Sequence, residues 1–243
     1  MRYTVNHHGA LSGDAANALA THGFVVLPGP YSPEELTRVQ SAYDVACTTA
    51  APADIGAGRT SLRVTDFVNR GSEFDPIYTW TPALDAAARV VGQPFRLSAM
   101  HARTLRPGAS AQELHVDVPR TSDAWPMLGL IFMVDEFRAD NGATRFVPGS
   151  HRRAELPEDV IADRLASHAD EVLACGPAGS VILFDASTWH GHTANTSAAG
   201  RRSLQATFIP RAGRAATDFV ARMQPETRAR LSPIARYLIG LDE

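Results

Sequence analysis

The first third of the chain carries hydrophobic residues mainly at helical spacing. In residues 12–22, Ala15, Leu19 and Ala20 fall on one side of a helix, and Gly23 is expected to end it. The following run, GFVVLPG, has the continuous apolar character of a buried strand. Two more helices are predicted, each opened by a hydroxyl residue and a proline, at residues 32–47 and 81–92.

From residue 95 the pattern changes to short runs of β-branched and apolar residues that are separated by turn signals such as Pro-Gly and Asn-Gly. Several short strands at this spacing are typical of a jelly roll. We therefore predict a mainly β protein with flanking helices and a double-stranded β-helix (jelly-roll, cupin-like) core. The runs are FRLSAMHARTL, ELHVDV, MLGLIFMVDEF, ATRFVPGS, SVILFD, WHGHTAN and RSLQATFIP.

The length of 243 residues fits one domain. Within residues 1–243 we expect N-terminal helices over 1–94, the jelly-roll core over 95–211 and a C-terminal helical tail over 212–243. The segment from Leu156 to Ala174 is predicted to be a helical insertion. In the tail, DFVARMQ and RARLSPIARYLIGL are predicted to be helical, with their arginines facing solvent.

Charge and composition limit the partners. A formal net charge of -3 favours neither nucleic-acid binding nor a polybasic membrane contact. No apolar stretch reaches the roughly 18–20 residues that span a bilayer, and the first residues lack the apolar run of a secretion signal. We expect a cytoplasmic enzyme or binding protein with a small-molecule ligand; the oligomeric state is not predicted.

The chain contains no lysine, because all 23 basic residues are arginine. This excludes a Schiff-base lysine and a P-loop lysine. Any bound anion must be held by arginine, histidine or neutral donors. Cys47 and Cys175 are far apart and form no CxxC pair, so we predict two core thiols rather than a disulfide or a thiolate zinc site.

Candidate metal ligands begin with His115 and Asp117, which lie one residue apart in the run ELHVDV. Residues i and i+2 of a strand point to the same face, so the imidazole and the carboxylate would enter one space. A third ligand would complete a facial triad of the kind that leaves open positions on iron. The HxD spacing is common in surface strands and needs a second motif to indicate a metal site.

The second motif follows the apolar strand GSVILFD. His190 and His192 share a strand face in WHGHTAN, so either could supply the third ligand. Arg201 comes eleven residues after His190, at the head of the strand RSLQATFIP. A guanidinium there could bind a carboxylate through two hydrogen bonds.

These motifs together resemble the phytanoyl-CoA dioxygenase family of Fe(II)/2-oxoglutarate oxygenases. The similar segments are HVD, DNGATRFVPGSH, GSVILFDASTWHGHTANTSAAGR and the opening GFVVLPGPYSPEEL. The family pattern has a histidine followed by glycine, an asparagine five residues later and an arginine eleven residues later. His190, Gly191, Asn195 and Arg201 meet these spacings.

The resemblance implies a role for individual residues. His115, Asp117 and His190 would ligate Fe(II), and Arg201 would bind the distal carboxylate of 2-oxoglutarate. Thr104 stands where the family often places a polar contact to this cosubstrate. His192 replaces a serine that is common near the cosubstrate carboxylate, and could donate the same hydrogen bond, face the substrate or be a core residue.

The resemblance implies an oxygenase that attacks a C–H bond of a small organic molecule, by hydroxylation or oxidative cyclisation of a natural-product intermediate. Asp117 disfavours halogenation, because halogenating relatives lack this carboxylate. Ile131 replaces a tryptophan of many relatives, which affects the pocket wall. Two alternatives stay open: a zinc hydrolase on the same ligands, and a jelly-roll binding module without catalysis.

Overall fold

The structure is a computed structural model that describes residues 9–58, 60–120 and 126–242. Its helices are α1 (Gly13–His22), α2 (Pro33–Thr48), α3 (Asp75–Tyr78), α4 (Thr81–Val91), α5 (Pro157–Val160), α6 (Pro225–Arg230) and α7 (Pro233–Ile239). Its strands are β1 (Phe24–Pro28), β2 (Ile55–Ala57), β3 (Ser61–Val64), β4 (Phe95–Leu105), β5 (Leu128–Met133), β6 (Thr144–Phe146), β7 (Val172–Ala174), β8 (Ser180–Asp185), β9 (His190–His192) and β10 (Arg201–Pro210).

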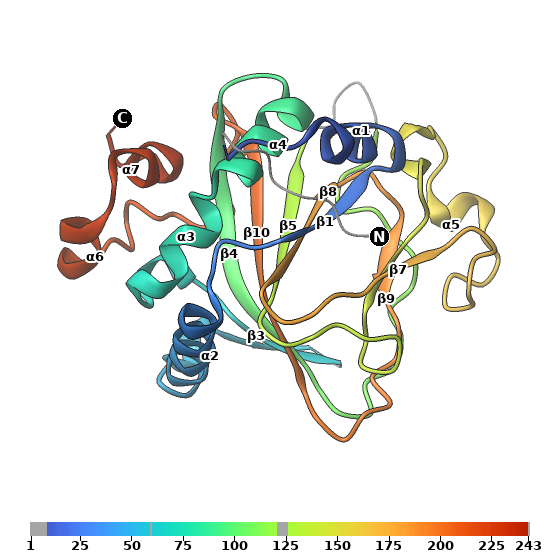
Figure 1. The fold of residues 1–243 in the computed structure, drawn as a ribbon, viewed down its shortest axis with the longest axis horizontal. Coiled ribbons are helices and arrows are strands. Elements are labelled where there is room, and N and C mark those ends of the chain that lie inside the picture. Colours follow the sequence, from blue (N-terminus) through green and yellow to red (C-terminus); the bar gives the residue numbers. More distant parts are fainter. Residues whose placement is uncertain (1–8, 59, 121–125, 243) are drawn as a thin grey trace.

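The described strands form two antiparallel sheets. The large sheet has seven strands in the order β1-β8-β5-β10-β4-β3-β2, and the small sheet has three in the order β7-β6-β9. Helices α2, α3, α4, α6 and α7 lie on one side of the large sheet, and β7 and β9 lie on the other (Figure 1). The predicted mainly β architecture with flanking helices is confirmed.

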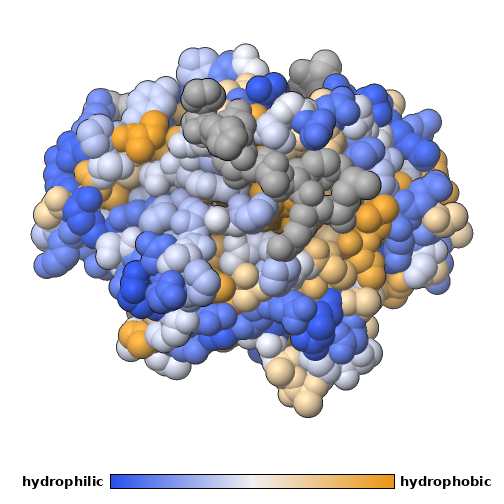
Figure 2. Space-filling model, viewed as in Figure 1, coloured by the Kyte–Doolittle hydropathy of each residue, from blue (hydrophilic) through white to orange (hydrophobic). Residues whose placement is uncertain are grey.

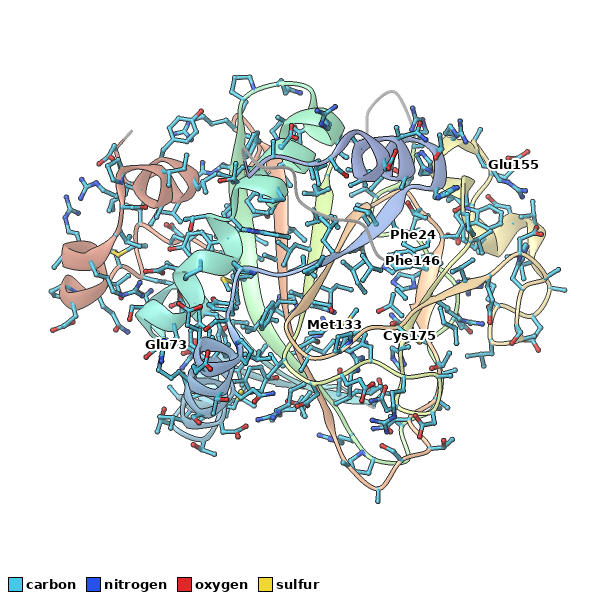
Figure 3. All side chains as sticks on the ribbon, viewed as in Figure 1. Phe24, Glu73, Met133, Phe146, Glu155 and Cys175 are labelled. Atoms are coloured by element: carbon cyan, nitrogen blue, oxygen red, sulfur yellow. The ribbon has the colours of Figure 1, made fainter. Side chains whose placement is uncertain are left out.

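Two of the three apolar cores among the described residues hold these layers together. The larger core joins the helices to the outer face of the large sheet. The smaller core fills part of the space between the sheets, where the rings of Phe24 and Phe146 stack with centroids 4.4 Å apart. Met133 belongs to the same core, and Figure 3 labels all three side chains. The rest of the space between the sheets is available for a polar site.

The three predicted N-terminal helices are confirmed, and their ends follow the capping residues. Ser12 accepts a hydrogen bond from the backbone N–H of Ala15 at the start of α1. Ser32 and Glu35 form a reciprocal capping box at the start of α2. Gly23 ends α1 with a φ of 85°, a conformation that glycine adopts without steric cost.

The N-terminal segment is less purely helical than expected. The predicted strand GFVVLPG is β1, and β2 and β3 form a further hairpin. All three strands pair into the large sheet, β1 with β8 and β3 with β4. The jelly roll therefore extends into the region before residue 95.

The helical insertion predicted from Leu156 to Ala174 is wrong, because only α5 is helical there. The Asp163 side chain accepts hydrogen bonds from the backbone N–H groups of Leu165 and Ala166, which makes a local turn. The carbonyls of Arg164 and Ala166 accept from the buried Arg145 guanidinium instead of from helix N–H groups. Tertiary hydrogen bonds replace the helix.

In the tail, DFVARMQ forms turns rather than a helix, and its arginine does not simply face solvent. Arg222 pairs with Asp54 and Asp66, and its carbonyl accepts from Asn69. Arg230 similarly pairs with Asp75 near α3. These ion pairs attach the tail to the N-terminal region, while Arg222 and Arg228 remain exposed, as predicted for the arginines of the tail.

None of the helices in the described residues has the length and hydrophobicity needed to cross a bilayer. The face seen in Figure 2 is mainly hydrophilic, with smaller hydrophobic areas between. Cys175 is exposed and Cys47 half-buried, so the prediction of two core thiols is wrong for Cys175.

Candidate metal centre and cosubstrate cavity

His115, Asp117 and His190 meet at the edge of the small sheet. The segment HVD is not a regular strand; His115 makes a single antiparallel bridge with His190 of β9 through two backbone hydrogen bonds of 2.9 Å. The Asp117 carboxylate lies 3.8 Å from His115 Nε2 and 3.6 Å from His190 Nε2. One ligand atom from each residue lies within 4.8 Å of the others.

Both histidines are oriented by backbone carbonyls. His115 Nδ1 lies 2.9 Å from the Glu113 carbonyl, and His190 Nδ1 lies 2.8 Å from the Thr188 carbonyl. Each Nδ1–H can donate there, which leaves the Nε2 lone pair directed at the shared space. Burial lowers the pKa of His190, against the opposing effect of Asp117, so the neutral ligand form is favoured.

A cavity of about 310 Å³ adjoins this cluster between the two sheets. Arg201 at the start of β10 lines it and is only 3% exposed. Its guanidinium lies 4.0 Å from the centroid of the Phe137 ring, and its Nε has no hydrogen-bond partner among the described residues. Burial lowers the pKa of Arg201 to about 9, so it stays charged at neutral pH.

The neighbouring Arg202 points the other way. Its guanidinium pairs with Asp135 at 2.7 Å and with Asp44 of α2 at 2.8 Å, on the helix side of the sheet. Gln205 shares the face of Arg201 and also lines the cavity. Because successive residues of a strand face opposite sides, Arg201 points into the cavity and Arg202 lies between the sheet and the helices.

His192 also lines the cavity but is outside the three-residue cluster. It is 3% exposed, and its Nδ1 lies 2.9 Å from the Thr193 carbonyl. Its Nε2 is buried without a hydrogen-bond partner among the described residues. Burial, as the largest cause, lowers the pKa of His192 to about 4, so the ring is neutral; its one N–H donates from Nδ1 to the Thr193 carbonyl, and Nε2 can accept a hydrogen bond from a ligand.

Thr104 does not reach the cavity, which corrects the expectation for this residue. Its hydroxyl lies 2.9 Å from the Tyr43 hydroxyl of α2, on the helix side of β4. The adjacent Arg103 and the next inward residue, His101, line the cavity instead. The sequence contained a signal for this: in MHAR, apolar Met100 and Ala102 alternate with the two polar residues.

Further residues shape the cavity wall. Ile131 of β5, which stands where many relatives carry tryptophan, is 4% exposed and lines the cavity. Gly129 lies so close to the Phe184 ring that an added Cβ would be 2.2 Å from it. The glycine therefore lets Phe184 fill this part of the wall.

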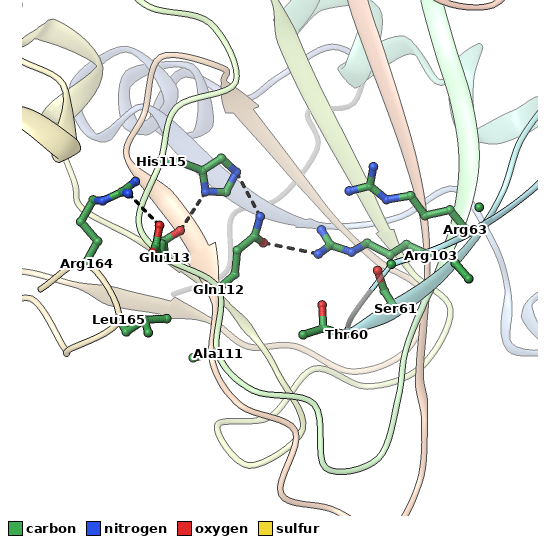
Figure 4. A pocket seen from close by; sticks show the side chains of 13 residues that line it. Thr60, Ser61, Arg63, Arg103, Ala111, Gln112, Glu113, His115, Arg164 and Leu165 are labelled. Atoms are coloured by element: carbon green, nitrogen blue, oxygen red, sulfur yellow. Dashed lines mark hydrogen bonds and ion pairs between the residues drawn. The ribbon is translucent and has the colours of Figure 1, made fainter.

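A second, outer cavity of about 600 Å³ lies on the other side of His115 (Figure 4). Arg63, Arg103 and Gln112 line both cavities, so the two spaces adjoin. Gln112 lies 3.4 Å from His115 Nε2 and accepts from Arg103 at 3.4 Å. The outer space thus leads towards His115, one of the three clustered residues.

The fold resembles solved structures of metal-dependent oxygenases. The crystal structure of HygX from Streptomyces hygroscopicus, with nickel and 2-oxoglutarate bound, aligns with a TM-score of 0.70 over 85% of this chain and 90% of HygX, at 16% identity. SnoK, a non-heme alpha-ketoglutarate-dependent carbocyclase from nogalamycin biosynthesis, aligns with a TM-score of 0.66 over 92% of both chains, at 22% identity. The double-stranded β-helix fold is confirmed.

Sequence relatives agree with this fold. The protein Rv1501 of Mycobacterium tuberculosis is 32% identical over 146 residues, which are 56% of this chain and 52% of that protein. Dioxygenase af480 of Aspergillus fumigatus is 26% identical over 246 residues, which are 94% of this chain and 76% of af480. The chain matches only about half the length of the mycobacterial relative.

The family assignment rests on a match that covers most of the chain. Residues 19–203 match the family Phytanoyl-CoA dioxygenase (PhyH), and this range contains the three clustered residues and Arg201. The resemblance inferred from HVD, NGATRFVPGSH and WHGHTAN is therefore confirmed. The chain belongs to the phytanoyl-CoA dioxygenase family.

Proposed function

We propose that this protein is an Fe(II)- and 2-oxoglutarate-dependent oxygenase that acts on a C–H bond of a small organic molecule. The observation that carries the proposal is the combination of two sites in one cavity. His115, Asp117 and His190 bring two imidazoles and one carboxylate together, and the buried Arg201 guanidinium lines the same space without a carboxylate partner among the described residues.

The donor set fits a mononuclear ferrous site. Two neutral imidazole nitrogens and one carboxylate oxygen form the facial triad that suits non-haem iron and leaves open positions for other ligands. The carbonyls of Glu113 and Thr188 hold both rings with Nε2 towards the shared space. We assign His115, Asp117 and His190 as the metal ligands.

The cavity also fits 2-oxoglutarate. Arg201 can bind the distal carboxylate through two charge-assisted hydrogen bonds, because its position over Phe137 fixes the plane of the guanidinium. His192 Nε2 also lacks a partner among the described residues, and because Nδ1 of the neutral ring donates to the Thr193 carbonyl, Nε2 can accept a hydrogen bond from a bound ligand. A buried, unpaired cation is costly unless a ligand compensates it, so this arrangement favours an anionic cosubstrate.

When bound, Fe(II) with 2-oxoglutarate and O2 supplies an oxidant for an unactivated C–H bond and yields succinate and CO2. The chain itself contributes orientation and exclusion of water. Arg201 fixes the far end of the cosubstrate, and Ile131 and Phe184 form an apolar wall beside the site. No side chain beyond the metal ligands is required to move a proton.

The substrate class we propose is a natural-product intermediate, oxidised by hydroxylation or oxidative cyclisation. HygX has been crystallised with hygromycin B, and SnoK is described as a carbocyclase from nogalamycin biosynthesis. The fold that this chain shares with them supports a small-molecule substrate of this kind. A cytoplasmic location and the lack of a nucleic-acid partner stay predictions.

A zinc hydrolase on the same ligands explains less of the structure. It would account for the three metal ligands but would leave the buried, unpartnered Arg201 and His192 without a purpose. A binding module without catalysis would not need the histidines to be oriented by carbonyls. We therefore favour the oxygenase.

The test is anaerobic spectroscopy followed by turnover. Metal-free protein that receives Fe(II) and 2-oxoglutarate without O2 should develop a visible charge-transfer band, and admission of air should produce succinate. His115→Ala and His190→Ala should each lose the band, and Asp117→Ala should sharply reduce succinate formation, because each removes a ligand.

The control variant is His22→Ala, which removes an exposed histidine at the end of α1 and should leave both signals intact. A band of equal strength in His115→Ala or His190→Ala would contradict the ligand assignment. A zinc-dependent hydrolysis without any 2-oxoglutarate turnover would support the hydrolase instead.

A further inference from the structure

The outer cavity has a distinctive set of polar residues that the proposed cosubstrate site does not use. Arg63 of β3 and Arg103 of β4 extend into it from one side, opposite His115 (Figure 4). Thr60 and Ser61 line the same space. The cavity therefore places the guanidinium groups of Arg63 and Arg103 and two hydroxyl groups beside His115.

The two arginines lack acidic partners. The Arg63 side chain is exposed and forms no hydrogen bond or ion pair with a described residue. Arg103 is half-buried, its Nε is unpartnered among the described residues, and its NH2 reaches only the neutral Gln112 at 3.4 Å. Burial and the nearby Arg63 lower the pKa of Arg103 to about 10, so Arg103 stays charged at neutral pH.

Arg164, in contrast, is already neutralised. It lines the same cavity but pairs with Glu113 at 2.7 Å. Asp117 is the one carboxylate that lines the inner cavity in the described part of the chain. The unpaired positive charge thus belongs to Arg63, Arg103 and Arg201.

The charges do not balance once the proposed metal and cosubstrate are counted. The two charges of Fe(II) offset those of the 2-oxoglutarate dianion, and Asp117 offsets one arginine. With Arg201 assigned to the cosubstrate, Arg63 and Arg103 keep two positive charges close together. Like charges at short range repel each other, and an anion between them would remove this repulsion.

We propose that the substrate carries an anionic group, a carboxylate or a phosphate, which Arg63 and Arg103 bind in the outer cavity. The inference deepens the proposed oxygenase function and rests on it. Guanidinium groups bind both oxyanions through paired hydrogen bonds. The anion would anchor one end of the substrate while its remaining part extends past Gln112 towards His115.

The test measures anion binding to the loaded protein. Titration calorimetry is carried out without O2 on protein that holds Fe(II) and just-saturating 2-oxoglutarate, so that Arg201 is occupied. The probes are benzoate, phenyl phosphate and the neutral isostere benzamide. Benzoate or phenyl phosphate should bind saturably, and benzamide should not. Whichever anion binds with the lower Kd indicates whether the anionic group of the substrate is a carboxylate or a phosphate.

Variants connect this binding to the two arginines. Arg63→Gln and Arg103→Gln should each lower the affinity for the anion by about tenfold or more, because each variant loses charge-assisted hydrogen bonds. Arg138→Gln is the matched control, since Arg138 is an exposed arginine that pairs with Asp140 on the surface. It should bind the anion as the unmodified protein does.

Several results would overturn the proposal. They are the absence of saturable binding by either anion, equally tight binding of benzamide, and unchanged affinity in Arg63→Gln. Weaker 2-oxoglutarate binding in Arg103→Gln, with benzoate affinity unchanged, would assign Arg103 to the cosubstrate. The charge-transfer band distinguishes failure of the oxygenase proposal from failure of the anion-site proposal. If the unmodified protein develops no band, the oxygenase proposal fails. If Arg63→Gln develops the band but binds the anion weakly, the substitution has affected the outer cavity and not the metal site.

Discussion

Arg201 and Arg202 are adjacent and chemically identical, but their surroundings differ completely. Successive residues of a strand face opposite sides, so β10 sends one guanidinium into the cavity and the other towards α2. Arg202 has two carboxylate partners, and these raise its pKa. Arg201 has none among the described residues, which is the physical basis for its assignment to an anionic cosubstrate.

Replacing Arg201 by alanine should raise the apparent KM for 2-oxoglutarate by one to two orders of magnitude. Hydrogen bonds to charged groups contribute roughly 1.5–3 kcal/mol each, and about 1.4 kcal/mol corresponds to a tenfold change. Arg201→Lys should recover little, because lysine lacks the planar fork. Succinate formation at varied 2-oxoglutarate concentration measures the effect.

Arg202→Ala is the matched control and should change this KM much less. Loss of the Arg202 side chain should instead lower the free energy of unfolding, because Asp135 and Asp44 lose their ion-pair partner. A large KM effect in Arg202→Ala together with a small one in Arg201→Ala would mean that the register of β10 is shifted by one residue.

The strand β9 holds the metal site together through its central glycine. Gly191 lies between His190 and His192 and packs against the backbone of the segment that leads to His115. A Cβ at this position would lie 2.8 Å from the Gln112 carbonyl oxygen and 3.0 Å from that of Glu113. Glycine therefore permits the close approach that brings the ligands together.

Gly191→Ala should separate these two segments and weaken the metal site. Forcing a methyl group into a packed position costs ~1–3 kcal/mol. If about 1.4 kcal/mol of this cost falls on the free energy of metal binding, the affinity for Fe(II) drops about tenfold. Fe(II) titration followed by the charge-transfer band measures the affinity, and urea unfolding measures the stability.

Gly13→Ala provides the control for Gly191→Ala. Gly13 begins α1, and nothing lies within 4 Å of the position of an added Cβ. This variant should be neutral or stabilised by up to ~1 kcal/mol, because alanine is favoured in helices. Equal iron affinity in both variants would argue against the proposed role of the close packing at β9.

The complete site is assembled from parts that are distant in the chain. His115 and His190 lie at the edge of the small sheet, Arg201 comes from the large sheet, and Arg63 comes from the edge hairpin. Ligands that bind across these elements would join both sheets in the folded state. No such site exists in the unfolded chain, so binding must stabilise the whole molecule.

Saturating Fe(II) and 2-oxoglutarate without O2 should therefore raise the melting temperature. Ligand at about 100 times its Kd adds ~2.7 kcal/mol, which for a chain of this length corresponds to roughly 5–10 °C. His190→Ala should lose most of this increase, because it removes a metal ligand. Thermal unfolding with and without both ligands measures it; an increase that persists in His190→Ala would place the binding elsewhere.

The sequence by itself determined the features that depend on local pattern. Capping residues predicted α1 and α2, alternation and turn residues predicted the jelly roll, and the HxD and HG motifs identified the residues that meet at the edge of the small sheet. The spacing from His190 also singled out Arg201, which lines the cavity. These features could be predicted because strand alternation and helix capping act over a few residues.

Only the tertiary structure decided which face of β4 enters the cavity and how the irregular segments fold. Thr104 was assigned to the cosubstrate by resemblance. In the structure its hydroxyl contacts the Tyr43 hydroxyl of α2, and the neighbouring Arg103 lines the cavity. The segments after Leu156 and around Arg222 have helical composition, but buried Arg145 and the carboxylates Asp54 and Asp66 bind them in other conformations. Contacts between residues distant in sequence outweighed local propensity there, since several hydrogen bonds and ion pairs exceed the few tenths of a kcal/mol per residue by which ordinary residues differ in helix preference.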